Sequence, residues 1–219
     1  MTKPITHPAA HSPRAWTLLL TVALMGTAID LASKAWAFRT IAPHPVTINR
    51  DQVLNAQHLA QFIPPHPPRV LIPNVLELTL VLNSGAVFGL GAGARWFFIA
   101  FTLAAVAFVI WAFATQTTPK QHLTHICAAL LIAGGLGNLY DRLRFACVRD
   151  FLHPLPHANI PFSTRPLWPY VSNIADAFLI LGIAGLLLFS LKRPRTTTHN
   201  PDKHSPNQTP DTPIPNTPS

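Results

Sequence analysis

Charged residues and cysteines are scarce in this chain of 219 residues, and each shortage excludes a class of protein. Asp, Glu, Lys and Arg make up only 11% of the sequence, whereas 49% is hydrophobic. That is too little charge to cover the surface of a soluble domain of this size. The two cysteines, Cys127 and Cys147, have no metal-ligand spacing and no CxxC pattern. A disulfide framework and a zinc site are therefore not expected, and a membrane protein is.

Acidic residues are the scarcer charge, because 8 Asp and Glu stand against 16 Lys and Arg and the net charge is +8. The basic residues are scattered singly between apolar runs and form no stripe. We therefore expect no nucleic-acid partner and attribute the excess charge to contact with anionic lipid headgroups. The histidines lie mainly in Pro-rich loops and tails without ligand spacing, so neither a metal nor another cofactor is expected.

Apolar stretches that are long enough, or nearly so, to cross a hydrocarbon core of roughly 30 Å occur four times. The sequence therefore predicts an all-α membrane protein with four transmembrane helices. The predicted spans are about residues 16–36, 96–114, 123–140 and 173–191. Residues 1–14 form a polar N-terminal tail, and residues 192–219 are Pro- and Thr-rich without apolar periodicity. We expect this second tail to be disordered.

The first apolar stretch also fits a cleavable signal peptide. Arg14 precedes the apolar run, and the sequence AWA at residues 35–37 resembles a cleavage site. Asp30 and Lys34 interrupt the region between the apolar run and that site, which favours a retained helix. Cleavage stays the alternative.

The segment 38–95 between the first two spans divides into two halves. The half that ends at Arg69 is rich in proline and predicts a loop with one short strand at most. The second half contains leucines at every other position from Leu76 to Leu82, which predicts a strand with one apolar face. A turn at Asn83-Ser84-Gly85 ends this strand.

The unusual polar residues fall on one side of the membrane if four spans alternate in direction. They are Asp30, Lys34, the turn at Asn83 and Gly85, Asn138, Asp141, Arg142, Asp150, Asn173 and Asp176. Ionisable groups near membrane depth are costly and usually functional. The clustering of four aspartates at one membrane face therefore predicts a functional site.

Each of these residues also has a purely structural interpretation. An aspartate in the first turn of a helix, such as Asp176, stabilises the positive end of the helix dipole. Asp30 and Lys34 are four residues apart and fit a local ion pair, and Asn138, Asp141 and Arg142 share one helical face and fit a structural pair at a helix end.

Gly134, Gly135 and Gly137 predict close helix packing. They do not predict a phosphate-binding loop, because no Lys-Ser/Thr follows them.

Asp150 has no such local role, because it lies among apolar residues in the loop after the third span. A second carboxylate beside it would create a pair that cannot ionise cheaply together. The two would share a proton, one acting as acid and one as base, which activates water against an amide.

Four sequence blocks resemble the lipoprotein signal peptidase (signal peptidase II) family, the bacterial membrane aspartyl peptidases. The blocks are DLASK at 30–34, NSGAVFGL at 83–90, GGLGNLYDRLRFACVRDFL at 134–152 and NIADAF at 173–178. The resemblance implies that the chain cleaves prolipoproteins just before a diacylglyceryl-modified cysteine. It also implies a location in the inner membrane with both termini cytoplasmic and the active site near the outer face. Residues 38–95 and 141–172 would be extracytoplasmic, and a small β-cradle would cover the substrate.

The resemblance also implies roles for individual residues. Asp150 and Asp176 match the catalytic dyad of the family. The matches to its supporting or substrate-binding positions are Asp30, Lys34, Asn83, Gly85, Asn138, Asp141, Arg142 and Asn173. The partners would be the lipidated precursor and membrane lipid, and nothing in the chain demands more than a monomer.

The sequence departs from the family pattern at positions close to the dyad. Ala146 stands where glycine is usual, Ser172 where phenylalanine is usual, and Val87 replaces a commoner alanine. Arg149 replaces an apolar residue next to Asp150, and we expect it to lower the pKa of that carboxyl group.

Two observations bear on the remaining alternatives. The cluster Lys192-Arg193-Arg195 after the last span gives weak support for a cytoplasmic C-terminus, because arginines are also common on the other side. A small transporter or proton-conducting protein is the rival function, but it should carry ionisable groups near mid-membrane. The second and fourth spans have none in their central parts.

Overall fold

Long helices occupy the positions of all four apolar stretches. The computed structural model describes residues 8–85 and 94–191. The long helices in this part of the chain are α1 (Pro13–Thr40), α3 (Ala94–Gln116), α4 (His122–Phe145) and α5 (Ile174–Leu191). Three of them, α1, α3 and α4, are long and apolar enough to cross a membrane, and the shorter apolar part of α5 is Ile174–Phe189. The prediction of a disordered tail at 192–219 lies outside the described residues.

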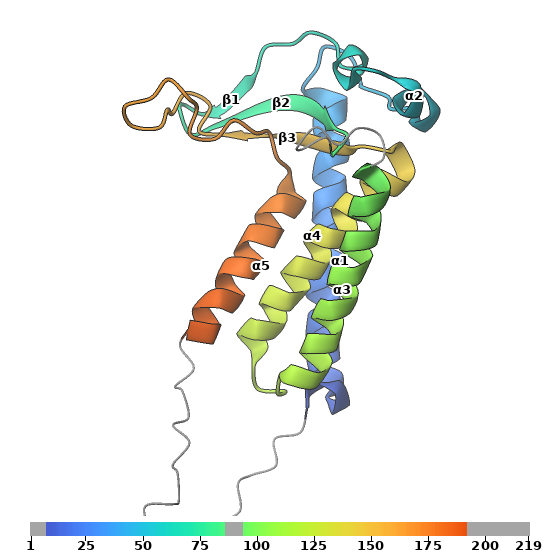
Figure 1. Cartoon of the computed structure of the whole chain (residues 1–219), viewed down its shortest axis with the longest axis vertical. Helices are drawn as coiled ribbons and strands as arrows, with labels where there is room; N and C mark the ends of the chain where they lie inside the picture. Colours follow the sequence, from blue (N-terminus) through green and yellow to red (C-terminus); the bar gives the residue numbers. More distant parts are fainter. Residues whose placement is uncertain (1–7, 86–93, 192–219) are drawn as a thin grey trace, which may run out of the picture.

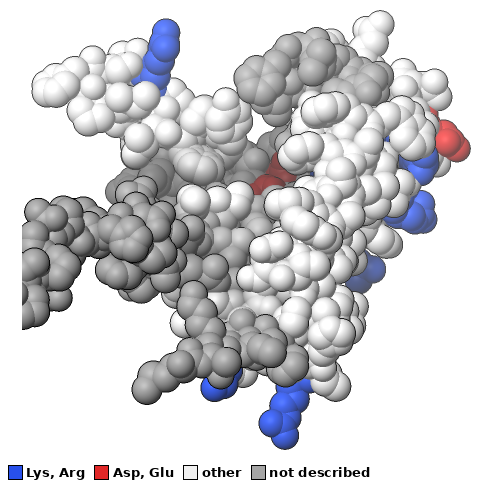
Figure 2. All heavy atoms as spheres, turned by 60° about the horizontal axis from the view of Figure 1, so that its bottom comes forward, with Lys and Arg blue, Asp and Glu red and all other residues white. Residues whose placement is uncertain are grey.

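The long helices run side by side with a small sheet across one end (Figure 1). At this end lie the C-terminal ends of α1 and α4 and the N-terminal ends of α3 and α5. The alternating directions inferred from the sequence are therefore present in the fold. Figure 2 shows that the described residues on this face are mostly uncharged, and that their Lys and Arg side chains lie mainly at its edges.

The Pro-rich half of the segment after α1 is partly helical, so the prediction of a loop with one strand at most is wrong. It contains the short helix α2 (Arg50–Asn55) and a 3-10 turn, η2 (Leu59–Phe62). The Asn49 side chain caps α2 by accepting a hydrogen bond from Asp51 N at 2.9 Å. A helix of six residues is too short to show an apolar period in the sequence. A further 3-10 turn, η1 (Ala9–His11), precedes α1.

The sheet is antiparallel and has the strand order β1-β2-β3. Its strands are β1 (Arg69–Ile72), β2 (Leu76–Asn83) and β3 (Val148–Pro154). In β2, Leu78, Leu80 and Leu82 are buried, which confirms the predicted apolar face. The strand ends at Asn83, as predicted. Asp150, however, lies within β3 and not in a loop.

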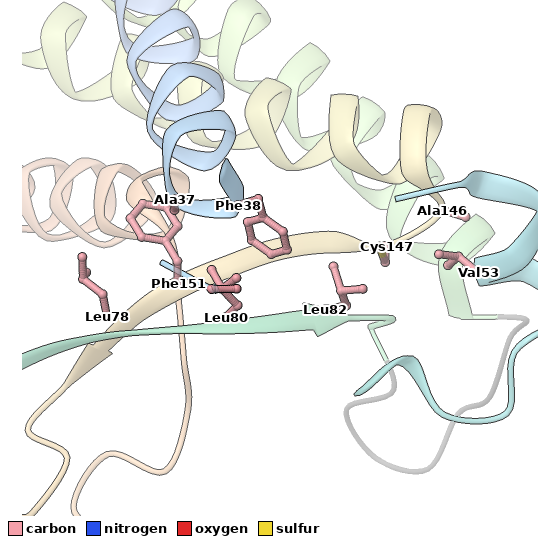
Figure 3. Packing of buried hydrophobic residues seen from close by; sticks show 10 residues of the cluster. Ala37, Phe38, Val53, Leu78, Leu80, Leu82, Ala146, Cys147 and Phe151 are labelled. Atoms are coloured by element: carbon pink, nitrogen blue, oxygen red, sulfur yellow. The ribbon is translucent and has the colours of Figure 1, made fainter. Parts of the chain in front are cut away.

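The sheet packs on the end of α1 through one apolar cluster. Figure 3 shows Leu80 and Leu82 of β2 directed toward Phe38 of α1, with Phe151 of β3 beside them. These side chains are at most 7% exposed. Their burial fixes the position of β3 relative to the helices, and β3 carries Asp150.

Helix α4 is the central helix, because it packs against α1, α3 and α5. The predicted role of its glycines in close packing is confirmed. A Cβ atom on Gly134 would lie 2.5 Å from the backbone oxygen of Ala175 in α5, and one on Gly137 would collide with the Asp30 carboxylate of α1. Only a residue without a side chain lets Asp30 lie against α4.

Candidate active site

Asp150 lies on β3, is 1% exposed, and accepts hydrogen bonds from two asparagine side chains. Asn83 at the end of β2 donates through Nδ2 to Oδ2 at 3.0 Å, and Asn173 donates through Nδ2 to Oδ1 at 2.6 Å. Burial raises the pKa of Asp150 to about 7, and the negative charge of Asp176 adds to this effect. The two asparagine donors and Lys34 oppose it. The carboxyl group therefore changes protonation state near neutral pH.

Asn83 is held in the correct orientation by the turn that follows it. Its Oδ1 accepts a hydrogen bond from Gly85 N at 2.9 Å, so its Nδ2 is the group available to Asp150. Gly85 has a φ of 79°, in the left-handed region that glycine adopts without strain. A Cβ atom there would lie 2.9 Å from the Phe98 ring of α3. The residues after the turn, including Val87, lie outside the described part.

Asp176 lies in the first turn of α5 and does form a helix cap. Its backbone N donates to Asn173 Oδ1 at 3.1 Å, and its Oδ2 accepts from Asn173 N at 3.2 Å. This reciprocal pair is a capping box, so the structural interpretation of Asp176 is correct in part. Its other oxygen, Oδ1, accepts a hydrogen bond from Asn138 Nδ2 at 2.8 Å.

Asn173 connects the two carboxylates. It bonds Asp150 through its side-chain amide and Asp176 through its backbone N and side-chain oxygen. Asn173 is fully buried, so water does not compete for these bonds. One residue therefore fixes an aspartate on a strand relative to an aspartate on a helix.

A buried lysine orients Asn138. Lys34 Nζ donates to Asn138 Oδ1 at 2.9 Å. An ammonium group only donates, so the amide oxygen of Asn138 must face Lys34 and its NH₂ group must face Asp176. Lys34 also pairs with Asp30 at 2.7 Å, as the spacing in the sequence predicts. Both side chains of this ion pair are 0% exposed.

Asp30 reaches the start of α5 as well as its local lysine. Its Oδ1 accepts a hydrogen bond from Ala175 N at 2.8 Å. This N–H group is in the first turn of α5 and has no partner within that helix. A carboxylate of α1 therefore caps the helix that presents Asp176.

Asp141 and Arg142 do not form the structural pair that their sequence positions suggest. The partners of Asp141 are Arg149, whose Nη2 lies 2.8 Å from its Oδ1, and Lys34, at 3.6 Å. Arg142 donates instead to the backbone oxygen of Asn138 at 3.3 Å and stacks over the Phe98 ring at 5.1 Å. Arg142 thereby links α4 to α3.

Arg149 does not act on Asp150 as the sequence predicts. Its guanidinium group contacts Asp141, and its backbone N also donates to Asp141 Oδ2, at 3.0 Å. Adjacent residues of a strand point to opposite faces, so Arg149 points away from its neighbour's carboxylate. The predicted lowering of the Asp150 pKa is wrong, because that pKa is raised. Arg149 instead ties the start of β3 to α4.

The sequence-predicted residues thus meet in one buried network, except that Arg142 and Gly85 support it from its edge. Phe98 is the contributor that sequence reasoning missed, and Arg149 is the one whose partner it predicted wrongly. The position of Arg149 beside Asp150 singles it out in the sequence, but nothing there indicates that it pairs with Asp141. Phe98 gives no signal, because it is one of several phenylalanines in an apolar helix.

Neither cysteine belongs to this network, and both are buried free thiols. Burial raises the pKa of Cys147 to about 12, so its thiol stays protonated at neutral pH. Within residues 8–85 and 94–191, no three His, Cys, Asp or Glu side chains gather in a way that would hold a metal ion.

The fold and the site define a helical membrane protein with a pair of aspartates that is equipped for acid–base chemistry. Residues 22–192 match the family Signal peptidase (SPase) II. This match covers most of the chain, which therefore belongs to the signal peptidase II family and is an aspartic peptidase. The resemblance seen in the four sequence blocks is confirmed.

Individual relatives agree with this assignment. The chain is 38% identical over 122 residues to a lipoprotein signal peptidase of Clostridioides difficile, across 55% of this chain and 74% of that protein. It is 34% identical over 155 residues to one of Sinorhizobium fredii, across 69% and 86%. A solved bacterial membrane enzyme shares the fold with a TM-score of 0.57 at 22% identity, over 80% of this chain and 87% of the other.

Proposed function

We propose that Asp150 and Asp176 are the catalytic dyad with which this peptidase removes signal peptides from prolipoproteins. Signal-peptide removal is the activity of the family to which the chain belongs. The assignment of the dyad rests chiefly on Asn173, which bonds both carboxylates. The bond cleaved is the one before the diacylglyceryl-modified cysteine of the precursor.

The raised pKa of Asp150 supports a division of roles within the dyad. A carboxyl group with a pKa of about 7 retains its proton for much of the time at neutral pH. Asp150 therefore carries the shared proton and donates a hydrogen bond to the carbonyl oxygen of the scissile amide. Asp176 is the general base that takes a proton from the attacking water. The tetrahedral intermediate then collapses as Asp176 donates the proton taken from water to the leaving nitrogen and the C–N bond breaks.

The remaining polar residues hold the dyad in place. Asn83, Asn138 and Asn173 each direct an amide NH₂ group at a carboxylate oxygen, and ordered donors of this kind cost no reorganisation during the reaction. Lys34, Asp30, Asp141 and Arg142 support these donors from α1 and α4. Gly85 shapes the turn beside the substrate.

We place all four long helices across the bacterial inner membrane, with both termini cytoplasmic and the dyad near the outer face. Helix α5 has 18 residues and is about 27 Å long at 1.5 Å per residue, close to the hydrocarbon thickness. The sheet end of the helices carries the polar network, which favours this end as the outer, substrate-facing side. The diacylglyceryl chains of the substrate stay in lipid while the amide reaches the dyad.

A monomer suffices for this activity, because the dyad and its supporting residues come from one chain. The rival interpretation, a small transporter or proton-conducting protein, has no observation in its favour. The carboxylates meet in one hydrogen-bonded network, and the family match identifies a peptidase.

The test uses a lipidated precursor and single substitutions. Asp150→Asn and Asp176→Asn are each expected to abolish cleavage, followed as a change in precursor size on a gel. Asp51→Asn is the control, because Asp51 is an exposed aspartate on α2 outside the network. Cleavage by either dyad variant at the rate of the control would show that the dyad is wrongly assigned.

A further inference from the structure

A pocket of about 280 Å³ lies between the sheet-side ends of α1 and α4, apart from the dyad. Arginines from three elements line it: Arg39 of α1, Arg144 of α4 and Arg149 of β3. Phe38, Phe145 and Ile48 form much of its apolar lining. The network around the dyad uses only Arg149 of these residues.

Two of the three arginines pair with no carboxylate in the part of the chain that the structure describes. The guanidinium of Arg149 is engaged by Asp141. Arg39 and Arg144 are exposed, and within residues 8–85 and 94–191 neither forms an ion pair with a carboxylate. Arg144 and Arg149 both lie over the Phe145 ring, with their guanidinium carbons 5.4 and 4.5 Å from its centroid. Two positive charges are therefore held next to the same aromatic ring.

The helix ends do not neutralise this charge. Arg39 and Arg144 lie in the last turns of α1 and α4, where each helix dipole supplies roughly half a negative charge. Because Asp141 neutralises only Arg149, the pocket stays net positive. A positively charged pocket with planar guanidinium groups on two walls suits a phosphate group, because each guanidinium can donate hydrogen bonds to two phosphate oxygens at once.

The surface below the pocket indicates that the phosphate belongs to a lipid. Trp36 lies three residues before Arg39, and Tyr140 lies four residues before Arg144, so each aromatic side chain shares a helix face with its arginine. Both are exposed, at 46% and 45%, as is Leu143 at 45%. Exposed Trp and Tyr on membrane helices mark the interfacial depth, and the arginines lie one turn beyond it, where lipid phosphates are found.

We infer that this pocket binds the phosphate of an anionic phospholipid in the outer half of the bilayer. The acyl chains would lie along the apolar surfaces of α1 and α4, and the headgroup would contact Arg39 and Arg144. The inference rests on the membrane placement proposed above and does not depend on which residues form the dyad. It assigns part of the chain's positive charge to a defined site.

The test measures thermal unfolding of the detergent-solubilised full chain with added short-chain phosphatidylglycerol. The wild type should be stabilised by this lipid, and more than by phosphatidylcholine of the same chain length. The double variant Arg39→Gln/Arg144→Gln should bind phosphatidylglycerol about tenfold more weakly, because two charge-assisted contacts are lost. The double lysine variant should bind with an intermediate affinity, because it keeps the charge without the planar geometry.

Three controls separate binding at this pocket from nonspecific effects of lipid or anion. Arg165→Gln removes an exposed arginine from the segment between β3 and α5, outside the pocket, and should respond like the wild type. Inorganic phosphate at the same concentration should not stabilise the protein. Precursor cleavage by each variant reports folding and tests the dyad separately. Equal stabilisation by inorganic phosphate, equal stabilisation by phosphatidylcholine, or an unchanged response of the double glutamine variant would each overturn the inference.

Discussion

Replacing Asp150 by asparagine should abolish cleavage and yet make the fold more stable at alkaline pH relative to the wild type. Asp150 is 1% exposed, and its pKa rises from 3.8 to about 7 on folding. Burial is the main cause, followed by the charge of Asp176. The folded state therefore binds this proton more tightly than the unfolded state. The stability gained from the proton is fully present below pH 3.8 and is lost as the pH rises through about 7.

The size of this effect follows from the change in pKa. One pH unit corresponds to about 1.4 kcal/mol, so the ionised Asp150 costs the wild type about 4 kcal/mol at high pH. The asparagine variant does not ionise and avoids this cost. The variant also places an NH₂ group, in place of a carboxylate oxygen, opposite the NH₂ group of Asn83 or Asn173, which costs about 1–3 kcal/mol. This cost is the same at every pH, because asparagine does not titrate.

The measurable quantity is the change in the stability difference with pH. Thermal unfolding of both proteins is measured in detergent between pH 4 and pH 9. The melting temperature of the variant should rise relative to that of the wild type as the pH increases. The gain should be on the order of 10 °C, given about 2–4 °C per kcal/mol for a chain of this size. Asp51→Asn should follow the wild type, because Asp51 is exposed. Parallel curves for Asp150→Asn and the wild type would refute this reasoning.

Three further substitutions test individual contacts. Ala146 follows α4 with a φ of 63°, in the left-handed region that is strained for alanine but not for glycine. Ala146→Gly should therefore stabilise the protein by about 1 kcal/mol in thermal unfolding, and a lower melting temperature would contradict this strain. Gly137→Ala should slow precursor cleavage and lower the melting temperature, because the methyl group of the new alanine would displace the Asp30 carboxylate. Unchanged kinetics would show that α1 and α4 can move apart without cost. Arg149→Leu should destabilise the fold by about 3 kcal/mol by leaving the Asp141 carboxylate short of a partner, and adding Asp141→Asn should recover much of the loss.

The sequence predicts the meeting of distant polar residues better than it predicts their partners. Alternating helix directions suffice to bring Lys34, Asn138 and Asp176 to one end of the molecule. The spacing of four residues also correctly predicts the pair of Asp30 and Lys34. Both predictions depend only on helix geometry, which is regular along the chain.

The errors concern contacts that cross between elements. Asn138, Asp141 and Arg142 share a helical face, which suggests a local structural pair, but β3 folds back so that Arg149 pairs with Asp141 instead. Nothing in the sequence indicates β3 as a strand, because its first four residues are buried on both faces and show no alternation. Without that strand, neither the location of Asp150 nor the direction of the Arg149 side chain can be predicted.

The ion pair of Asp30 and Lys34 also bears on how the protein is made. Helix α1 leaves the ribosome long before Asn138 and Ala175, the later partners of these two charges, have been synthesised. An isolated aspartate or lysine opposes insertion by about 2.5–3.5 kcal/mol at the centre of a membrane helix and by less toward its end, where Asp30 and Lys34 lie. In the membrane placement proposed above, α1 would be inserted with a neutral pair, because the two charges lie one helical turn apart and bond each other. The pair would then keep both charges compensated until α5 is synthesised and Ala175 N bonds Asp30.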